Sequence, residues 1–278
     1  MKNRRVSLYL NSKIIDQIDD VVDGIAIRSR SEAIERILTN YLSDRKTVVI
    51  LAGGQPQDVK ISGLGVYRPL AKIGKKTLVE DMLFKCREAG FKNIIIVGNP
   101  SVIAKIYEVL GDGMNYDLSI NYVEDKEALG TAKTLEKVKK YIKTEFLLVP
   151  CDHYFDFDLR KLYEFHIKND GTASFGVHTR TTFEYLKTSV VEMDGFKIVN
   201  YEEHPKKPKT HLVCTFIGFL KPEVFDYIPP GNVFWSMQEH VFPKLAKEGK
   251  MFGYPVAGNW VNVHTKKDVD LAIALTNK

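Results

Sequence analysis

The chain has 278 residues, of which 44% are hydrophobic and 27% are charged, and its formal net charge is +5 at pH 7. This length exceeds the ~100–150 residues of a typical single domain, so two domains are expected. No apolar run approaches the ~20 residues that span a bilayer, and the N-terminus lacks a signal-peptide pattern, which excludes a membrane partner. The three cysteines lie far apart without metal-ligand spacing, which is typical of reduced thiols in a cytoplasmic protein.

Residues 4–10 alternate between apolar and polar side chains. The apolar face consists of Val6, Leu8 and Leu10, and the other face consists of Arg5, Ser7 and Tyr9. Such alternation predicts a strand with one buried face. The polar face is basic, because Arg4 and Arg5 stand at its start with no acidic residue before Asp16.

Two short helices are predicted after this strand. Asn11 or Ser12 is placed to cap a helix that runs to about Val22. The stretch Ser29-Arg30-Ser31-Glu32 has the spacing of a capping box and predicts a second helix to about residue 42. One strand and two short helices bury too little surface alone, so this unit is expected to pair with a second copy, forming at least a dimer.

The order of these elements, with the stretch Arg-Ser-Arg-Ser-Glu-Ala-Ile, resembles the ribbon-helix-helix repressors over residues 4–43. In that family two chains pair their strands into a ribbon that enters the major groove of operator DNA. The resemblance implies base contacts from the first strand and a phosphate contact at the start of the second helix. The DNA-binding residues it implies are Arg4, Arg5, Ser7, Tyr9, Ser29 and Arg30. A pure dimerisation arm over residues 1–45 is the alternative.

Residues 46–278 are predicted to form a second, α/β domain. Strands are expected at 47–51, 94–98, 119–123, 146–150, 173–177, 189–193 and 213–220. Helices are expected at 77–89, 101–110, 130–141, 158–168 and 236–248. This alternation favours a mostly parallel sheet covered by helices on both faces, a three-layer α/β/α arrangement.

Six segments of this domain resemble, in order, the sugar-nucleotide nucleotidyltransferases, whose fold is Rossmann-like. They begin at Leu51-Ala-Gly-Gly54, Arg68-Pro-Leu, Glu127-Ala-Leu-Gly-Thr-Ala, Val149-Pro-Cys-Asp152, Tyr201-Glu-Glu-His-Pro and Gly258-Asn-Trp-Val-Asn262. These enzymes join a nucleoside triphosphate to a sugar phosphate and release pyrophosphate. The ligand-binding residues that the resemblance implies are Leu51, Ala52, Gly53, Gly54, Arg68, Gly130, Thr131, Asp152, Glu203, His204 and Asn262.

The chain departs from the family pattern at the groups that meet phosphates. Gln55-Pro56-Gln57-Asp58 stands where the family has a loop ending in Gly-Thr-Arg. Pro56 removes a backbone N–H, and Asp58 reverses a charge. At ~4 Å and an effective dielectric of ~20, that reversal would weaken triphosphate binding by several kcal/mol.

Five further positions differ from the family. Arg68 replaces Lys, Asn262 replaces a metal-binding Asp, His204 replaces Lys, and His264 and Phe216 replace Gly. These departures predict that the domain has no catalytic residues. If the domain is active after all, Asp152 and Arg68 are the expected catalytic residues. No cofactor follows with certainty, and the resemblance places Mg²⁺ at Asp152 if nucleotide binds.

Two functions follow from these patterns. The first is a DNA-binding transcription regulator whose large domain senses a nucleotide, sugar nucleotide or sugar phosphate without turnover. The alternative is an active sugar-phosphate nucleotidyltransferase that carries a DNA-binding or dimerisation arm. The two hypotheses differ in whether residues 46–278 release pyrophosphate.

Overall fold

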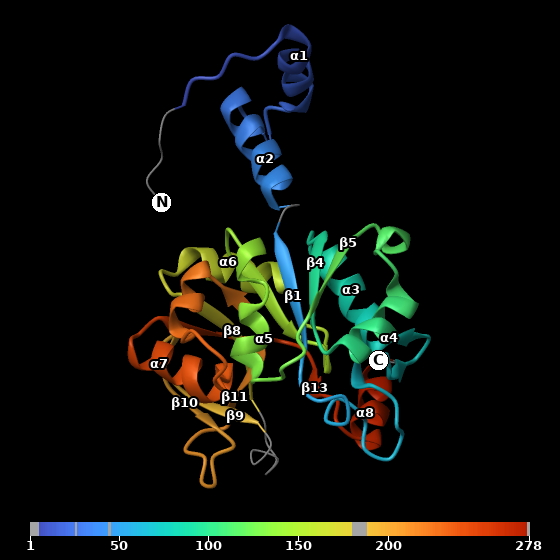
Figure 1. The fold of residues 1–278 in the computed structure, drawn as a ribbon. Helices are drawn as coiled ribbons and strands as arrows, with labels where there is room; N and C mark the ends of the chain where they lie inside the picture. Colours follow the sequence, from blue (N-terminus) through green and yellow to red (C-terminus); the bar gives the residue numbers. More distant parts are fainter. Residues whose placement is uncertain (1–5, 26, 44–45, 180–187, 277–278) are drawn as a thin grey trace. The chain divides into compact units, whose positions relative to one another are not determined.

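The computed structural model describes residues 6–25, 27–43, 46–179 and 188–276 (Figure 1). The chain divides into two compact units, Met1–Arg45 and Lys46–Lys278. Among the described residues, none of the helices is both long and apolar enough to cross a membrane.

The N-terminal unit consists of helices α1 (Ser12–Val21) and α2 (Arg30–Ser43). Asn11 caps α1, because its side-chain oxygen accepts a hydrogen bond from the backbone N–H of Ile14 at 3.0 Å. The helices share a small apolar core made of Ile18, Ile27 and Ala33. Both helices begin and end close to the positions that the capping residues predict.

The strand expected at residues 4–10 is absent from the single chain over its described part, residues 6–10. Val6 is 73% exposed and Leu8 is 55% exposed, so the apolar face of the segment is not buried within the unit. A strand needs a neighbouring strand to satisfy its backbone N–H and C=O groups, and residues 6–25 and 27–43 of this unit offer none. Arg4 and Arg5 lie outside the described residues.

The larger unit is built on a nine-stranded sheet with strand order β5-β4-β1-β6-β11-β8-β12-β10-β9. Its strands are β1 (Thr47–Ala52), β4 (Asn93–Gly98), β5 (Ser119–Glu124), β6 (Phe146–Pro150), β8 (Ala173–Thr179), β9 (Ser189–Asp194), β10 (Lys197–Glu203), β11 (Leu212–Leu220) and β12 (Met251–Pro255). The sheet is parallel from β5 to β6, and antiparallel pairs predominate beyond β6. The α/β class is thus confirmed, with more antiparallel pairing than expected.

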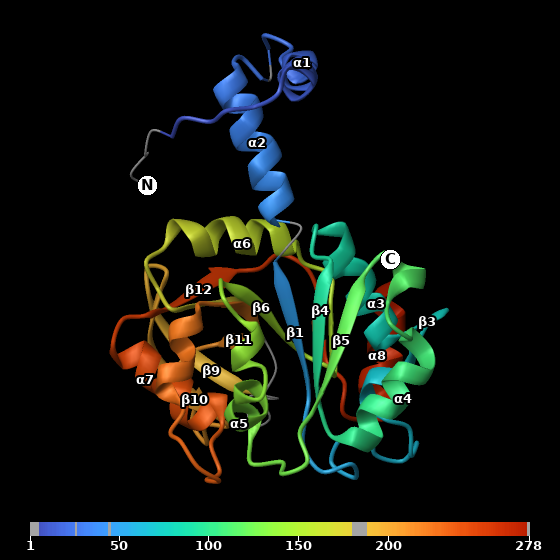
Figure 2. The ribbon, with the colours of Figure 1, turned by 45° about the horizontal axis from the view of Figure 1, so that its top comes forward.

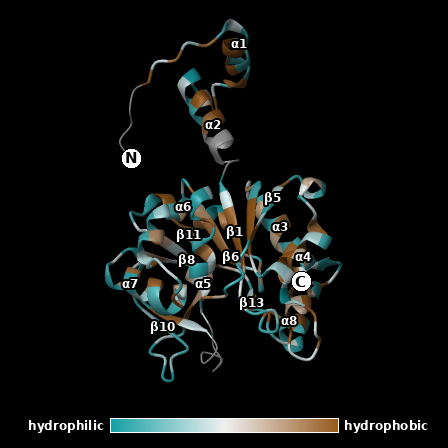
Figure 3. Cartoon of the chain, in the orientation of Figure 1, coloured by the Kyte–Doolittle hydropathy of each residue, from teal (hydrophilic) through white to brown (hydrophobic). Residues whose placement is uncertain are grey.

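Helices cover both faces of this sheet (Figure 2). Side chains of β1 alternate between the two faces: Val48 and Ile50 pack against α3, α4 and α6, whereas Val49 and Leu51 pack against α5 and α7. The hydropathy colouring of Figure 3 shows the apolar residues of the central strands between these layers. The helices are α3 (Leu78–Glu88), α4 (Pro100–Leu110), α5 (Thr131–Glu136), α6 (Leu159–Lys168) and α7 (Phe242–Lys247).

Smaller elements complete the unit beside the main sheet. Two-stranded pairs join β2 (Lys72–Ile73) to β3 (Lys76–Thr77) and β7 (His153–Phe155) to β13 (Trp260–Asn262). Helix α8 (Lys266–Thr276) packs on them in a third apolar cluster. The register of β7 and β13 places Asn262 opposite His153. Short 3₁₀ turns lie at Arg68–Leu70, Met114–Tyr116, Lys139–Tyr141 and Pro222–Tyr227.

Two predicted helices are divided in the structure. The helix expected at 130–141 ends at Glu136 and is followed by a separate 3₁₀ turn. The helix expected at 236–248 consists of a π-helical turn, Met237–Val241, followed by α7. Pro243 explains the second division, because proline lacks an N–H and is tolerated only in the first turn of a helix.

Candidate active site

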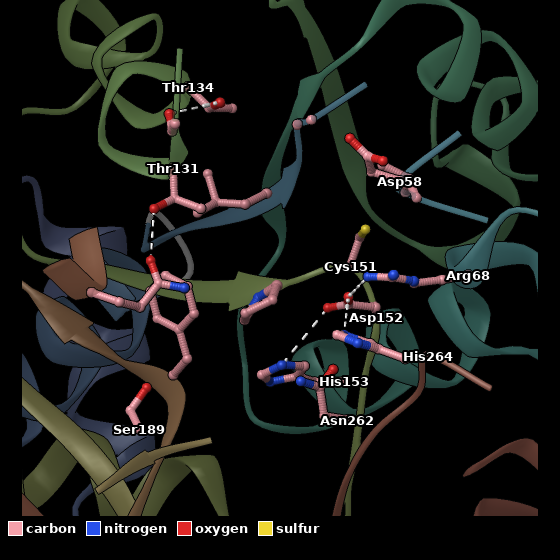
Figure 4. A pocket seen from close by; sticks show the side chains of 18 of the residues that line it. Asp58, Arg68, Thr131, Thr134, Cys151, Asp152, His153, Ser189, Asn262 and His264 are labelled. Atoms are coloured by element: carbon pink, nitrogen blue, oxygen red, sulfur yellow. Dashed lines mark hydrogen bonds and ion pairs between the residues drawn. The ribbon is translucent and has the colours of Figure 1, made fainter. Parts of the chain in front are cut away.

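A cavity of about 490 Å³ opens beside the carboxyl ends of β1 and β6. Ligands of open α/β sheets bind at this edge. All the expected ligand-binding residues line the cavity except Ala52, which is buried beneath it. Figure 4 shows a cluster around Asp152, with Thr131 and Ser189 lying apart from it.

Two glycines allow the backbone to pack closely at one end of the cavity. A Cβ atom on Gly53 would lie 2.5 Å from the side-chain oxygen of Thr134. Gly130 has a φ of +96°, and a Cβ atom there would lie 2.6 Å from the carbonyl oxygen of Trp235. Both positions therefore require glycine. The hydroxyl of Thr131 at the start of α5 donates to Gln238 at 2.7 Å.

A buried carboxylate, Asp125, supports this end of the cavity and was not singled out from the sequence. It is 1% exposed and accepts a hydrogen bond from the hydroxyl of Thr134 at 2.6 Å. It also accepts from the backbone N–H groups of Glu127 and Ala128. Asp125 thereby holds the loop before Gly130 against α5. Neither its acidic type nor its position after a strand distinguishes it in the sequence from a surface residue.

One arginine and two histidine side chains surround Asp152 at the centre of the cavity. Arg68 Nη1 lies 3.0 Å and His264 Nε2 lies 3.2 Å from one carboxylate oxygen, while His153 Nε2 lies 3.7 Å from the other (Figure 4). Burial alone would raise the pKa of Asp152. The hydrogen bond from His264 and the charges of His153 and Arg68 outweigh burial and hold this pKa well below its ordinary value. Asp152 is therefore an anion at neutral pH.

A second acidic group, Glu203, lies at the other end of the cavity. It accepts a hydrogen bond from the hydroxyl of Ser189, and His204 Nε2 lies 3.3 Å from its other oxygen. Burial raises the pKa of Glu203 above its ordinary value. His204 has a φ of +47°, an uncommon conformation that turns the chain at this end.

Oxygen donors at the cavity fit a Mg²⁺ ion. Asn262 Oδ1 is buried without a hydrogen-bond partner in the part of the chain that is described, and it lies on β13 next to the strand that follows Asp152. Mg²⁺ prefers oxygen ligands and usually takes one or two carboxylates together with substrate phosphates and water. Within the described ranges no three His, Cys, Asp or Glu side chains form a metal cluster. Asp152 and Asn262 would therefore hold the ion only together with a phosphate ligand.

The departures seen in the sequence take different places in the cavity. Asp58 lines the cavity but is exposed, so water and salt weaken its repulsion of phosphate below the value expected from the sequence. Arg68 points at the centre, where it is paired with Asp152. Phe216 also lines the cavity and has a φ of +57°. Arg68 thus keeps a positive charge at the cavity centre, where His264 also donates a hydrogen bond to Asp152.

The residues expected to contact DNA belong to the N-terminal unit. Ser7 and Tyr9 are exposed. The hydroxyl of Ser29 accepts a hydrogen bond from Glu32 N–H at 3.2 Å, as expected of a helix cap. Arg30 is engaged within the unit, because its guanidinium donates two hydrogen bonds to Asp19, at 2.5 and 2.6 Å.

Comparison with known proteins defines the class of the large unit. Residues 47–273 match the profile of the family described as nucleotidyl transferase, and the chain belongs to this family. A mannose-1-phosphate guanyltransferase of Yarrowia lipolytica is 26% identical over 79% of the chain. A UTP–glucose-1-phosphate uridylyltransferase of Synechocystis is 29% identical over 81% of the chain. The chain covers 61% and 62% of the lengths of these relatives.

A solved structure shares the fold. It is a Bacillus anthracis protein described as a glucose-1-phosphate thymidylyltransferase, in complex with a sucrose. The TM-score is 0.76, with 20% identity, and the match covers 84% of the chain and 95% of that structure. This likeness confirms the nucleotidyltransferase fold.

These comparisons overturn the first functional hypothesis, a transcription regulator whose large domain binds ligand without turnover. The relatives that match this domain are named as sugar-phosphate nucleotidyltransferases. The error came from treating each departure as an independent loss of phosphate binding. In the folded chain Asp58 is exposed, and Arg68 keeps a positive charge at the cavity centre.

Proposed function

We propose that residues 46–278 transfer a nucleotidyl group from a nucleoside triphosphate to a sugar 1-phosphate and release pyrophosphate. One phosphate oxygen of the sugar phosphate forms a bond to the α-phosphorus, and the bond from that phosphorus to the pyrophosphate oxygen breaks. The observation that carries this proposal is the cavity in which Arg68 and Asp152 stand between a glycine-rich end and an acidic end. Because the named relatives act on mannose and glucose 1-phosphates, hexose 1-phosphates are the proposed acceptors.

Each end of the cavity suits one substrate. Gly53 and Gly130 line one end of the cavity without side chains, which leaves the backbone there open to a nucleotide. Glu203 and Ser189 offer hydrogen bonds to sugar hydroxyls. Arg68 would neutralise phosphate charge between the two substrates. Mg²⁺ bound by Asp152 and Asn262 would neutralise further phosphate charge.

The test is pyrophosphate release by the full chain with Mg²⁺. The panel combines five nucleoside triphosphates with mannose, glucose and galactose 1-phosphates, and GTP with mannose 1-phosphate is tried first because several relatives carry that activity in their names. We expect one pair to give a nucleotide sugar, identified by mass, together with an equal amount of pyrophosphate. No nucleotide sugar from any pair would refute the proposal.

For the N-terminal unit we propose that two copies pair through residues 6–10 and that the paired segment binds duplex DNA. Support comes from the exposed apolar residues Val6 and Leu8, which alternate with exposed Ser7 and Tyr9.

Light scattering of the full chain should give a dimer, and Leu8→Asp should give a monomer. Fluorescence anisotropy with labelled duplexes tests the DNA contact. A wild-type monomer would contradict the pairing, and a Tyr9→Ala variant that binds every duplex as wild type does would contradict the DNA contact.

A reducing compartment is consistent with this proposal. Cys86, Cys151 and Cys214 are buried and free. Burial raises the pKa of the Cys86 and Cys214 thiols to about 12. Both thiols are therefore protonated and unreactive at neutral pH. We propose the cytoplasm as the place where the protein works.

A further inference from the structure

Strand β11 contains an irregularity at Phe216. Its register with β8 shifts between Cys214 and Gly218, and Phe216 in between has a φ of +57°. Left-handed backbone is disfavoured for bulky residues and persists where the surrounding structure enforces it, commonly at functional sites. A bulge of this kind re-aims a side chain.

Thr215 fixes the bulge. Its hydroxyl donates a hydrogen bond to the carbonyl oxygen of Gly176 on β8 at 2.9 Å. The hydroxyl oxygen of Thr215 also accepts a hydrogen bond from the backbone N–H of Ile217 at 3.3 Å. Thr215 is fully buried, so water does not compete for these bonds. The conformation of Phe216 is thus held from both sides.

Aromatic neighbours immobilise the Phe216 ring. It lies 5.4 Å from the ring of Phe242 in an edge-on arrangement and 6.3 Å from the ring of Phe175. Only 8% of Phe216 is exposed, and that part lines the cavity. Because well-packed side chains do not yield space without strain, the ring forms a rigid wall.

This wall belongs to the acidic end of the cavity. Val213 on β11 pairs with Val190 on β9, so the residues that follow Val213 lie near Ser189. A second aromatic residue, Phe234, belongs to the opposite end, because its ring lies 3.2 Å from the position of a Cβ atom on Gly130. Each end of the cavity therefore has its own aromatic residue.

We propose that Phe216 is a specificity-determining residue, which limits the acceptor to hexose 1-phosphates with small substituents and excludes acetamido sugars. This inference rests on the proposed function. The ring offers a flat apolar face to the sugar, while Glu203 and the buried Thr188 hydroxyl, which has no hydrogen-bond partner among the described residues, bind its hydroxyl groups. An acetamido group in place of a hydroxyl would need the space that the Phe216 ring fills.

The test measures acceptor binding by calorimetry and does not depend on turnover. The probes are glucose 1-phosphate and N-acetylglucosamine 1-phosphate, which differ only at one substituent. Wild-type protein should bind the acetamido compound at least about tenfold more weakly, the usual effect of a steric misfit in a pocket. Phe216→Gly, which suits the left-handed backbone, should reduce this ratio to less than about threefold. The control Phe234→Ala should keep the wild-type ratio.

Several outcomes would overturn the inference: no discrimination by the wild type, the same ratio in Phe216→Gly, an equal change in Phe234→Ala, or no binding of either compound. If Phe216→Gly does not fold, Phe216→Leu keeps part of the side chain and should give an intermediate ratio. The proposed function is judged separately. Absence of pyrophosphate release with a changed binding ratio would refute the transfer reaction and leave the role of Phe216 standing.

Discussion

The carboxylate of Asp152 has three side-chain partners in the cavity. They are Arg68, His153 and His264. Sequence reasoning placed it at the end of a strand, and the structure adds the two histidines. No spacing in the sequence relates His264 to Asp152, because they lie far apart in the chain, next to the strands β13 and β7. The hydrogen bond between the residue after β13 and the residue before β7, Val263 N–H to Asp152 C=O at 2.8 Å, brings them together.

Asp152→Asn is expected to lower the rate of pyrophosphate release by at least about 100-fold. The amide keeps the shape but removes the negative charge that pairs with Arg68 and that would hold Mg²⁺ in the proposed reaction, and electrostatic groups of this kind contribute on the order of 100-fold or more. Steady-state kinetics with the active substrate pair measures the effect. Asp170→Asn, a change of the same type at an exposed residue outside the cavity, serves as the control. A rate within threefold of wild type would show that Asp152 does not act in the reaction.

His166 is a residue whose burial makes stability depend on pH. It is 1% exposed, and its Nδ1 lies 2.9 Å from the hydroxyl of Ser174. Burial lowers the pKa of His166 to about 4. Because this pKa lies below the ordinary value of about 6.5, the unfolded chain takes up the proton first. Stability is full above pH 6.5 and falls as the pH drops toward 4.

His166→Asn should remove this part of the acid sensitivity. The wild type should lose about 2 kcal/mol of unfolding free energy between pH 7.5 and 5.0 through His166, and the variant should lose that much less. Urea unfolding at the two pH values gives the difference. His211→Asn changes an exposed histidine and is the control. Equal pH dependence in wild type and His166→Asn would contradict the assignment.

At the scale of elements, helix α3 begins at a complete capping box. Thr77 Oγ1 accepts from Glu80 N–H at 3.3 Å, and the Glu80 carboxylate accepts from Thr77 N–H at 2.6 Å. Thr77→Ala removes one half of the box and should cost about 1–2 kcal/mol of unfolding free energy. Thr77→Ser keeps the hydroxyl and should recover most of it. Equal losses in both variants, measured in urea, would assign the effect to the methyl group instead.

Elements defined by local signals were predicted well, whereas those defined by partners were not. Capping residues and apolar periodicity located α1, α2, α3 and α6 to within about two residues. Strands β10 and β12 were missed, because polar residues interrupt the apolar residues of β10, and β12 is short and contains a glycine and a proline. The strand expected at residues 4–10 needs a second copy as its partner, and residues 6–10 are not a strand in the single chain, so this expectation stays a prediction. Alternation indicates which side chains share a face and does not supply the neighbouring strand.

At the scale of the whole molecule, the two units differ in how much core each has. The N-terminal unit buries only Ile18, Ile27 and Ala33 among its described apolar residues, while the larger unit contains three extensive clusters. So small a core gives marginal stability without a partner. If two copies pair, calorimetry should show a transition of the N-terminal unit whose midpoint rises with protein concentration, because association stabilises the folded form.

The transition of the larger unit should not move with concentration. Leu8→Asp, which is aimed at pairing, should lower the first midpoint and abolish its concentration dependence while leaving the second unchanged. Two concentration-independent transitions in the wild type would show that the N-terminal unit is stable alone.

The sequence by itself determined the α/β class of the large unit, the positions of helices α3, α4 and α6 and the order of its nucleotidyltransferase segments, because these depend on local patterns and on residue type. Tertiary structure alone decided the chemistry of the cavity. It left Asp58 exposed and placed His264 on Asp152. It also placed Phe216, with its left-handed backbone, in the wall of the cavity. The effect of a side chain's charge or volume on a ligand depends on its distance from the ligand and on its burial. Both are fixed only when strands that lie far apart in the sequence pair with one another.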